Sequence, residues 1–114
     1  KTVATPLIAG GYLYVGTLAG TVFKISIKTG EIKAKFDTGG LINLPLSVSG
    51  DKLFIPVIDG RLILLNASKL EPIQTVSFDG RIRTGAVSNG DLIFIGYDNG
   101  KIAILKAIPT QVGD

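Results

Sequence analysis

A pair of arginines, Arg81 and Arg83, is the feature of this sequence that could bind a charged ligand. Guanidinium groups can hold a carboxylate or a phosphate through two parallel hydrogen bonds. The alternative is structural, an ion pair with Asp79 or with a carboxylate from another repeated unit of the chain. What the pair does therefore depends on the elements that position it.

The residues needed for the common kinds of catalysis are missing. The chain has no His and no Cys, so a Ser nucleophile would have only Lys as its base. Thiol chemistry, disulfides and zinc–thiolate sites are excluded for the same reason. Asp51 and Asp91 recur in one turn, and Asp37 and Asp79 recur at strand ends before Gly, which indicates turn formation. The sequence predicts no catalytic, cofactor-binding or metal-binding residue.

The composition is that of a folded unit with a modest charge. Of the 114 residues, 46% are hydrophobic, and the net charge is +3. No apolar run approaches the roughly 20 residues of a membrane helix, so we expect no direct membrane insertion. The charge is too small for a nucleic-acid-binding surface. Four lysines on outer strands near the start of the chain are predicted to form a solvated rim: Lys24, Lys28, Lys33 and Lys35.

The chain contains an internal repeat. The phrase "GDLIFIGYDNGKIAIL" resembles both "GDKLFIPVIDGRLILL" and "GGYLYVGTLAGTVFKI". These phrases begin at Gly90, Gly50 and Gly10, so they recur at a constant period of about 40 residues. The sequence therefore predicts one unit built from three tandem repeats, residues 1–40, 41–80 and 81–114, of which the last is incomplete.

Each repeat is predicted to consist of short β-strands, because its β-branched and aromatic runs are too short for ordinary helices. Ala19-Gly20, Asp59-Gly60 and Asn99-Gly100 are predicted two-residue hairpin turns, in which both central residues need positive φ. The predicted strands are 3–8, 12–17, 21–27 and 32–37 in the first repeat, 44–48, 52–58, 61–66 and 73–78 in the second, and 83–87, 92–97 and 101–106 in the third.

The strand patterns separate buried sheets from half-exposed ones. Residues 62–65 ("LILL") and 102–105 ("IAIL") are apolar on both faces, as expected of a sheet between two neighbours. In the first repeat, apolar positions 23, 25 and 27 alternate with Lys24, Ser26 and Lys28. That alternation predicts that the polar side of this sheet faces water.

Four strands in about 40 residues are typical of a β-propeller blade. The predicted fold class is therefore all-β, with three antiparallel blades of which the last lacks its outer strand. Propellers usually have four to eight blades around a channel, so three blades do not close a ring. The start "KTVATP" indicates a processed chain or a segment of a longer one. We favour a segment of a larger propeller over copies that associate to complete one.

The stretch "TPLIAGGYLYVGTLAGTVFKISIKTGEIKAKF" resembles the repeat of the pyrroloquinoline-quinone-like propeller family. The Trp that ends this family's repeat is absent, with Phe36 and Phe78 near its place, and Pro56 replaces a Gly. The turn before the fourth strand of the second repeat reads "SKLE", whereas the corresponding turn of the first repeat reads "TGE". The positions that carry the resemblance are Pro6, Gly16, Gly20 and residues 29–31 in the first repeat, Pro45 and Gly60 in the second, and Gly96 and Gly100 in the third.

The resemblance implies one of two kinds of function. Some members are quinoprotein dehydrogenases, which use an adjacent-cysteine disulfide, a stacking Trp and acidic calcium ligands. Others carry no cofactor and act as scaffolds or sensors. Because this chain has no Cys and no Trp, no cofactor residue can be carried over. We therefore expect the branch without a cofactor, a non-catalytic scaffold or binding module outside the cytoplasm, in the periplasm, at the cell surface or secreted.

The predicted partner surface for a protein is one face of the blades. The turn at residues 97–99, between the second and third strands, should share that face with the linkers at 37–40 and 79–81. The candidate partner-binding residues are Arg81, Arg83, Tyr97, Asp98, Asn99 and Asp59.

Two other functions stay open from the residues alone. The chain could belong to a quinone-dependent dehydrogenase whose active site lies outside it. It could also be a structural subunit whose open third blade captures a strand from the next copy.

Overall fold

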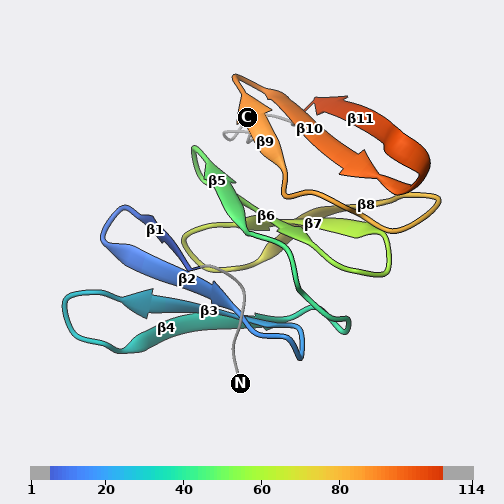
Figure 1. Cartoon of the computed structure of the whole chain (residues 1–114). Helices are drawn as coiled ribbons and strands as arrows, with labels where there is room; N and C mark the ends of the chain where they lie inside the picture. Colours follow the sequence, from blue (N-terminus) through green and yellow to red (C-terminus); the bar gives the residue numbers. More distant parts are fainter. Residues whose placement is uncertain (1–5, 107–114) are drawn as a thin grey trace.

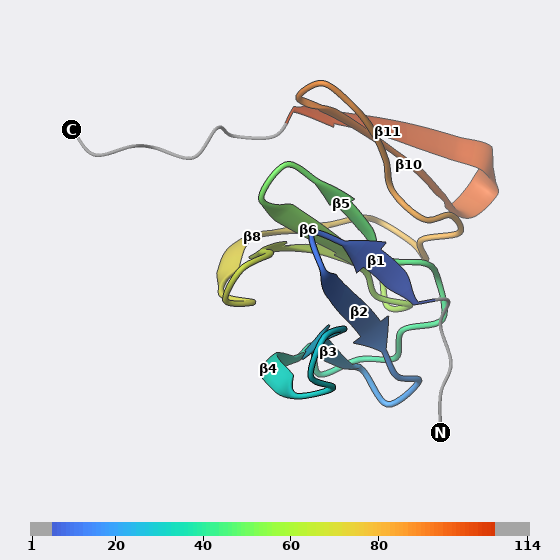
Figure 2. The same cartoon turned by 90° about the vertical axis from the view of Figure 1, so that its left-hand side faces the viewer.

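The computed structural model describes residues 6–106, which form eleven β-strands in three antiparallel sheets and one short 3-10 turn. The all-β prediction is confirmed. Sheet 1 has the order β1-β2-β3-β4, sheet 2 the order β5-β6-β7-β8, and sheet 3 the order β9-β10-β11. Figures 1 and 2 show the three sheets side by side, with sheet 2 between the other two.

The strands of sheet 1 are β1 (Leu7–Ala9), β2 (Tyr12–Gly16), β3 (Thr21–Ser26) and β4 (Ile32–Asp37). Those of sheet 2 are β5 (Ser47–Ser49), β6 (Lys52–Pro56), β7 (Arg61–Asn66) and β8 (Pro72–Ser77). Those of sheet 3 are β9 (Val87–Asn89), β10 (Leu92–Tyr97) and β11 (Lys101–Lys106), with the turn η1 (Asp98–Gly100) between the last two.

The strand pairing reproduces the repeat seen in the sequence. Tyr14 lies opposite Lys24, Phe54 opposite Leu64 and Phe94 opposite Ile104. A register shift follows Lys24 in sheet 1 and Leu64 in sheet 2, at equivalent positions. Residues at the same position of different repeats are therefore structural equivalents.

The innermost strands begin later than predicted. The expected strands 44–48 and 83–87 are observed as β5 and β9, which start at Ser47 and Val87. The linker residues before them cross between sheets, with Ile42 and Ile82 buried. Before β5, the carbonyl of Leu41 accepts the N–H of Ile58 in the following hairpin loop at 2.9 Å. Before β9, Ile82 and Tyr97 form only an isolated bridge, and the N–H of Arg83 donates to Gly96 of β10 at 2.8 Å. Residues 3–5 of the first predicted strand lie outside the described residues.

Two of the three hairpin turns also differ from the prediction. In the β2–β3 and β6–β7 loops only the glycine has positive φ, +100° at both Gly20 and Gly60. The N–H of Gly60 donates to Val57 at 3.0 Å, so these are three-residue loops with a glycine bulge. The third turn has positive φ at both Asn99 (67°) and Gly100 (70°), as predicted. Asn adopts this left-handed conformation more readily than most residues.

The hydrophobic core has two layers, one on each side of sheet 2. The first layer, between sheets 1 and 2, includes Tyr14, Val22, Ile55 and Leu65, and the second lies between sheets 2 and 3. All five residues of β6 are buried, and so is the run 62–65 of β7, as the pattern "LILL" predicted. In "IAIL", by contrast, Ile102 and Ile104 are exposed.

Candidate functional site

The hairpin loops and the linkers between sheets form one hydrogen-bonded row, which we call the loop face. The N–H of Thr38 donates to the carbonyl of Gly20 at 2.9 Å, and the N–H of Phe78 donates to that of Gly60 at 2.8 Å. The carbonyls of the linkers bond in turn to the following loops, Leu41 to Ile58 and Arg81 to Asp98. The turn at 97–99 therefore lies on the same face as the linkers.

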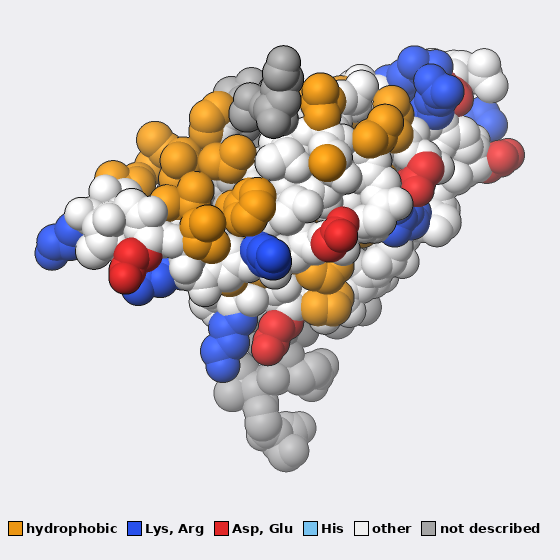
Figure 3. Space-filling model, turned by 90° about the horizontal axis from the view of Figure 1, so that it is seen from below, with side chains coloured by type: hydrophobic (Ala, Val, Ile, Leu, Met, Phe, Trp, Pro, Cys, Tyr) orange, Lys and Arg blue, Asp and Glu red, His pale blue; other side chains and the backbone are white. Residues whose placement is uncertain are grey.

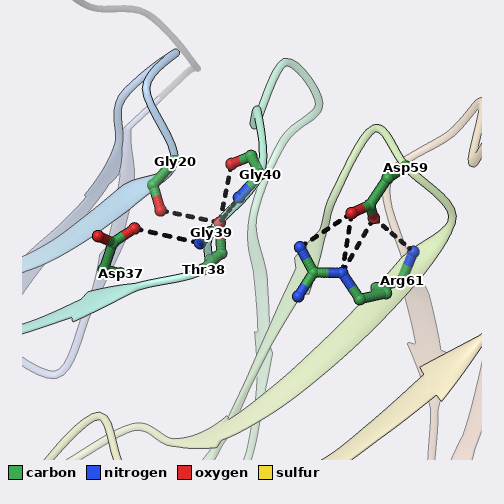
Figure 4. A network of polar contacts seen from close by, with 7 residues as sticks. All are labelled: Gly20, Asp37, Thr38, Gly39, Gly40, Asp59 and Arg61. Atoms are coloured by element: carbon green, nitrogen blue, oxygen red, sulfur yellow. Dashed lines mark hydrogen bonds and ion pairs between the residues drawn. The ribbon is translucent and has the colours of Figure 1, made fainter.

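Thr38 joins the first loop to the first linker. Its hydroxyl oxygen lies 2.9 Å from the carbonyl oxygen of Gly20 and 2.8 Å from that of Gly40, and its proton can be donated to either one. The same oxygen accepts the N–H of Gly40 at 3.2 Å. Asp37 accepts the N–H of Gly39 at 3.1 Å, as expected of an aspartate that stabilises a turn. Figure 4 shows this network beside the second loop.

Asp59, a predicted partner-binding residue, is engaged within its own hairpin. Its carboxylate accepts from the Nε of Arg61 at 3.0 Å and lies 2.9 Å from the Nη2 of the same side chain. It also accepts the backbone N–H of Arg61 at 3.2 Å. The two side chains face each other in Figure 4, next to Gly40. Asp59 therefore shapes the second loop and lies apart from the other candidate residues.

Asp98 is the carboxylate that binds the predicted arginine pair. Its Oδ1 accepts from the Nε of Arg83 at 2.6 Å, and its Oδ2 accepts the backbone N–H of Arg81 at 2.8 Å. These bonds, with that from Arg81 the larger influence, hold the pKa of Asp98 below its ordinary value of 3.8. The partner predicted from sequence was Asp79 or a carboxylate of another repeat. The observed partner belongs to the same repeat as the arginines.

Asp98 is peculiar to the third repeat. The equivalent residues of the other two loops, Leu18 and Ile58, are apolar. The residue equivalent to Arg83 in the second repeat is Asn43. An acidic residue and an arginine thus appear together in one repeat, 15 positions apart, and bond to each other. Comparing the repeats position by position would have revealed this pair from the sequence.

An open hollow of about 420 Å³ lies beside this pair. The ring of Tyr97 packs against that of Phe78 at a centroid distance of 5.1 Å. The Nζ of Lys101 lies 5.8 Å from the Tyr97 ring centroid, within reach of a cation–π interaction. The residues that line the hollow are Arg83, Thr84, Gly96, Tyr97, Asp98, Asn99, Gly100, Lys101 and Ile102.

The structure thus brings together five of the six predicted residues, since Arg81 bonds to Asp98 at the edge of the hollow. Sequence reasoning missed Lys101 and Phe78. Lys101 directly follows the predicted Asn99-Gly100 turn, and its position on the loop face could have been inferred from that turn. Phe78 could not, because its contact with Tyr97 is made between two sheets.

Lys24 is buried, so the prediction that it belongs to a solvated lysine rim is wrong. It is 6% exposed and points into the layer between sheets 1 and 2, where its Nζ donates to the carbonyl of Ser68 at 2.8 Å. The Nζ also lies 4.1 Å from the ring centroid of Tyr12. Burial lowers the pKa of Lys24 below its ordinary value of 10.5. The polar side of β3 therefore faces sheet 2 and not water, while Lys28, Lys33 and Lys35 are exposed.

The described residues hold neither a long apolar helix nor a metal-binding cluster. Between residues 6 and 106 there is no helix with the length and hydrophobicity needed to span a membrane. The same part of the chain holds no group of three or more His, Cys, Asp or Glu side chains placed to bind a metal ion.

Comparison with protein-family models and with curated proteins gives no match. Solved structures do match. The chain superposes on BamB from Moraxella catarrhalis with a TM-score of 0.77 at 18% identity, over 85% of this chain and 31% of that one. It superposes on the quinohemoprotein alcohol dehydrogenase ADHIIG from Pseudomonas putida HK5 with a TM-score of 0.81 at 19% identity, over 91% and 19% of the two chains. For the computationally designed Ika4 protein the TM-score is 0.80 at 14% identity, over 90% of this chain and 64% of that one.

These likenesses concern the fold alone, because the three identities, 18%, 19% and 14%, are low. The chain spans less than two thirds of the length of each of these structures. Its sheet order, its internal repeat and its superposition on these proteins lead to one conclusion. The described residues are consecutive blades of a β-propeller, as the sequence predicted.

Proposed function

We propose that this chain is a segment of a non-catalytic β-propeller that binds an acidic segment of a protein partner at the loop face. The observation that carries the proposal is the hollow of about 420 Å³ lined by Arg83, Tyr97 and Lys101. Propeller loops vary on a rigid frame, so binding specificity resides in them. The candidate residues are five of those predicted from sequence, Arg81, Arg83, Tyr97, Asp98 and Asn99, with Lys101 added.

The charges around the hollow favour an anionic partner. Arg81, Arg83 and Lys101 supply three positive charges, against the two carboxylates of Asp79 and Asp98. Asp98 is already bonded to the side chain of Arg83 and to the backbone of Arg81. Positive charge therefore exceeds negative charge, which would attract and orient an acidic segment.

Arg83 is held in a suitable orientation. Asp98 bonds to its Nε, and among residues 6–106 no carboxylate bonds to its terminal nitrogens. A guanidinium held in this way still presents terminal N–H groups to a carboxylate. The neighbouring rings of Phe78 and Tyr97 provide an apolar surface beside the charge. Charged and aromatic groups together are typical of binding hot spots.

The test is binding of fluorescein-labelled acidic peptides, followed by fluorescence anisotropy. We expect an Asp/Glu-rich peptide to bind and a Lys-rich peptide of the same length not to bind. Arg81→Gln/Arg83→Gln should weaken binding roughly tenfold or more, since hydrogen bonds between charged groups contribute about 1.5–3 kcal/mol each. Arg83→Lys, which keeps the charge but loses the planar fork, should also weaken it.

The matched control is Lys28→Gln/Lys35→Gln, which removes the same charge at exposed positions away from the loop face. An equal loss of affinity in this control would mean that net charge, and not the loop face, attracts the peptide. That result, or failure of the wild-type chain to bind any acidic peptide, would contradict the proposal. Thermal unfolding of each variant shows whether the fold is retained.

A dehydrogenase segment is the second candidate function. Its support is that three similar solved structures are a methanol dehydrogenase and two quinohemoprotein alcohol dehydrogenases. In that case the residues of the reaction would lie outside this chain. Retention of pyrroloquinoline quinone by the complete protein, measured by absorbance after addition of the quinone and Ca²⁺, would support it over the scaffold. An extracytoplasmic location stays a prediction from the family resemblance.

A further inference from the structure

The loop face is a row of five segments in a fixed order. The first hairpin loop bonds to the first linker, which bonds through Leu41 to the second loop at Ile58. The second loop bonds through Gly60 to the second linker, and that linker bonds through Arg81 to the third loop at Asp98. Figure 1 shows these loops and linkers along one side of the three sheets, at its right-hand edge. Neighbours in this row are therefore neighbours in space.

The first three segments of the row present apolar side chains. Leu18 in the first loop is 45% exposed, and Leu41 in the first linker is 52% exposed. Ile58 in the second loop is partly exposed, and its N–H donates to the carbonyl of Leu41 at 2.9 Å. We call these three residues the apolar half of the loop face.

The last two segments present charged side chains at the equivalent positions. Arg81 is the equivalent of Leu41, and Asp98 is the equivalent of Ile58. Together with Arg83, which bonds to Asp98, they form the charged half of the loop face. The same structural positions are thus apolar at the start of the row and charged at its end.

The exposure of the apolar half does not depend on where the chain begins or ends. Leu41 and Ile58 belong to the junction of sheets 1 and 2, both of which the structure describes. A further sheet of a longer propeller would pack beyond sheet 1 or beyond sheet 3. Figure 3 shows the side on which sheet 1 lies, where other hydrophobic side chains gather. A further sheet would cover those side chains, but it would not cover Leu41.

Asp59 lies in the second loop, between the two halves. Its carboxylate accepts from the Nε of Arg61 at 3.0 Å and lies 2.9 Å from the Nη2 of the same side chain. The guanidinium compensates the negative charge of Asp59 within the loop, so this residue opposes an acidic segment only weakly. A segment bound at the charged half can therefore continue over the second loop toward Leu41.

We infer, as an extension that rests on the proposed function, that the acidic segment of the partner also carries a large apolar side chain. That side chain packs on the apolar half while the carboxylates of the segment bond to Arg81 and Arg83. Both kinds of group belong to one segment, because the second loop joins the two halves through backbone hydrogen bonds. Burial of the apolar side chain contributes affinity, and the charged groups contribute orientation.

The test uses three fluorescein-labelled Asp/Glu-rich peptides of equal length and charge, followed by fluorescence anisotropy. One has leucines at its N-terminal end, one has them at its C-terminal end, and the third has serines in their place. Both leucine peptides are used, since a segment can lie along the row in either direction. We expect one of them to bind roughly tenfold or more tightly than the serine peptide, the order of effect expected from burial of one leucine side chain.

Leu41→Ser tests the apolar half directly. It should reduce the ratio of the two affinities, leucine peptide over serine peptide, to near one, because the leucine of the peptide loses its contact. The matched control is Ile73→Ser, which removes an exposed apolar side chain from the outer strand β8 and should keep the ratio. Added salt should weaken both peptides and keep the ratio, since screening acts on charges. If circular dichroism shows that Leu41→Ser is unfolded, Leu41→Ala replaces it.

The outcomes separate this inference from the proposed function. Equal binding of leucine and serine peptides to the wild-type chain, or an unchanged ratio in Leu41→Ser, overturns the apolar contact and leaves the acidic partner standing. Absence of binding by all three acidic peptides contradicts both. A Lys-rich peptide with the same leucines should not bind. If it binds as tightly as the acidic leucine peptide, the contact lacks the expected charge selectivity, and the inference is overturned.

Discussion

The phenolic hydroxyl of Tyr14 donates a hydrogen bond of 2.9 Å to the main-chain carbonyl of Ala67, 53 residues later in the chain. This buried bond links the centre of sheet 1 to the corner after β7 in sheet 2. It is one of two polar contacts from sheet 1 to that corner, the other being Lys24 with Ser68. Burial, followed by the nearby Tyr12, raises the pKa of Tyr14 above its ordinary value of 10.0.

Tyr14→Phe should destabilise the fold by about 1–2 kcal/mol, because the buried carbonyl of Ala67 loses its donor. Urea unfolding followed by circular dichroism measures the change. The control is Tyr12→Phe, whose hydroxyl makes no hydrogen bond with any residue between 6 and 106. Equal effects of the two substitutions would show that the bond to Ala67 contributes nothing measurable.

Lys24→Leu introduces the residue that the second repeat carries at Leu64. Burial lowers the pKa of Lys24 in the folded chain, so the unfolded chain binds this proton more tightly. The protonated lysine therefore reduces stability at neutral pH, and that cost decreases as the pH rises toward 10.5. We expect wild type to gain stability relative to Lys24→Leu over that range. Urea unfolding of both proteins at several pH values measures this difference.

Tyr14 is present in both proteins, and its ring centroid lies 5.9 Å from the Nζ of Lys24, so the two contributions are separated by the sign of their pH dependence. Its raised pKa acts in the opposite direction, because stability is lost as the pH rises above 10.0. A stability difference between wild type and Lys24→Leu that does not change with pH would show that Lys24 keeps an ordinary pKa in the folded chain.

Asp98→Asn should alter the acid stability of the chain. The pKa of Asp98 is lowered on folding, so its contribution to stability is present above 3.8 and is lost as the pH falls through the lower folded value. The stability difference between wild type and Asp98→Asn should therefore shrink as the pH falls below 3.8. Asp79→Asn, which removes a carboxylate from the adjacent linker without breaking the bond to Arg83, is the matched control. Unfolding by urea between neutral and acid pH checks both variants.

Three equivalent glycines should respond differently to alanine. A Cβ atom at Gly20 would overlap the carbonyl oxygen of Gly40, and one at Gly60 would overlap that of Gly80. At Gly100 there is nothing within 4 Å, so only the positive φ of 70° opposes the substitution, at about 1–2 kcal/mol. Gly20→Ala and Gly60→Ala should thus lower the melting temperature much more than Gly100→Ala. Similar losses at all three positions would mean that the linkers shift to accommodate the new side chain.

Much of the fold could be predicted from the sequence because it depends on local pattern. The period of the repeat, the outer strands and the third hairpin turn at Asn99-Gly100 all follow from residue type and spacing. The inner strands were placed too early, because the linker before β5 bonds to the next hairpin loop, and the linker before β9 pairs with β10 only at an isolated bridge between Ile82 and Tyr97. The groups to which these linkers bond depend on contacts between sheets, which the residues of a single repeat do not determine.

The candidate site shows the same division. The sequence determined that arginines and a polar turn occur together in the third repeat, and that no His or Cys is available. Tertiary structure decided that Asp98, and not Asp79, binds Arg83, and that Phe78 packs on Tyr97. It also decided that Lys24 is buried while Phe23 and Ile25 remain partly exposed. Alternation along a strand defines two faces, but only the neighbouring sheet determines which face is buried.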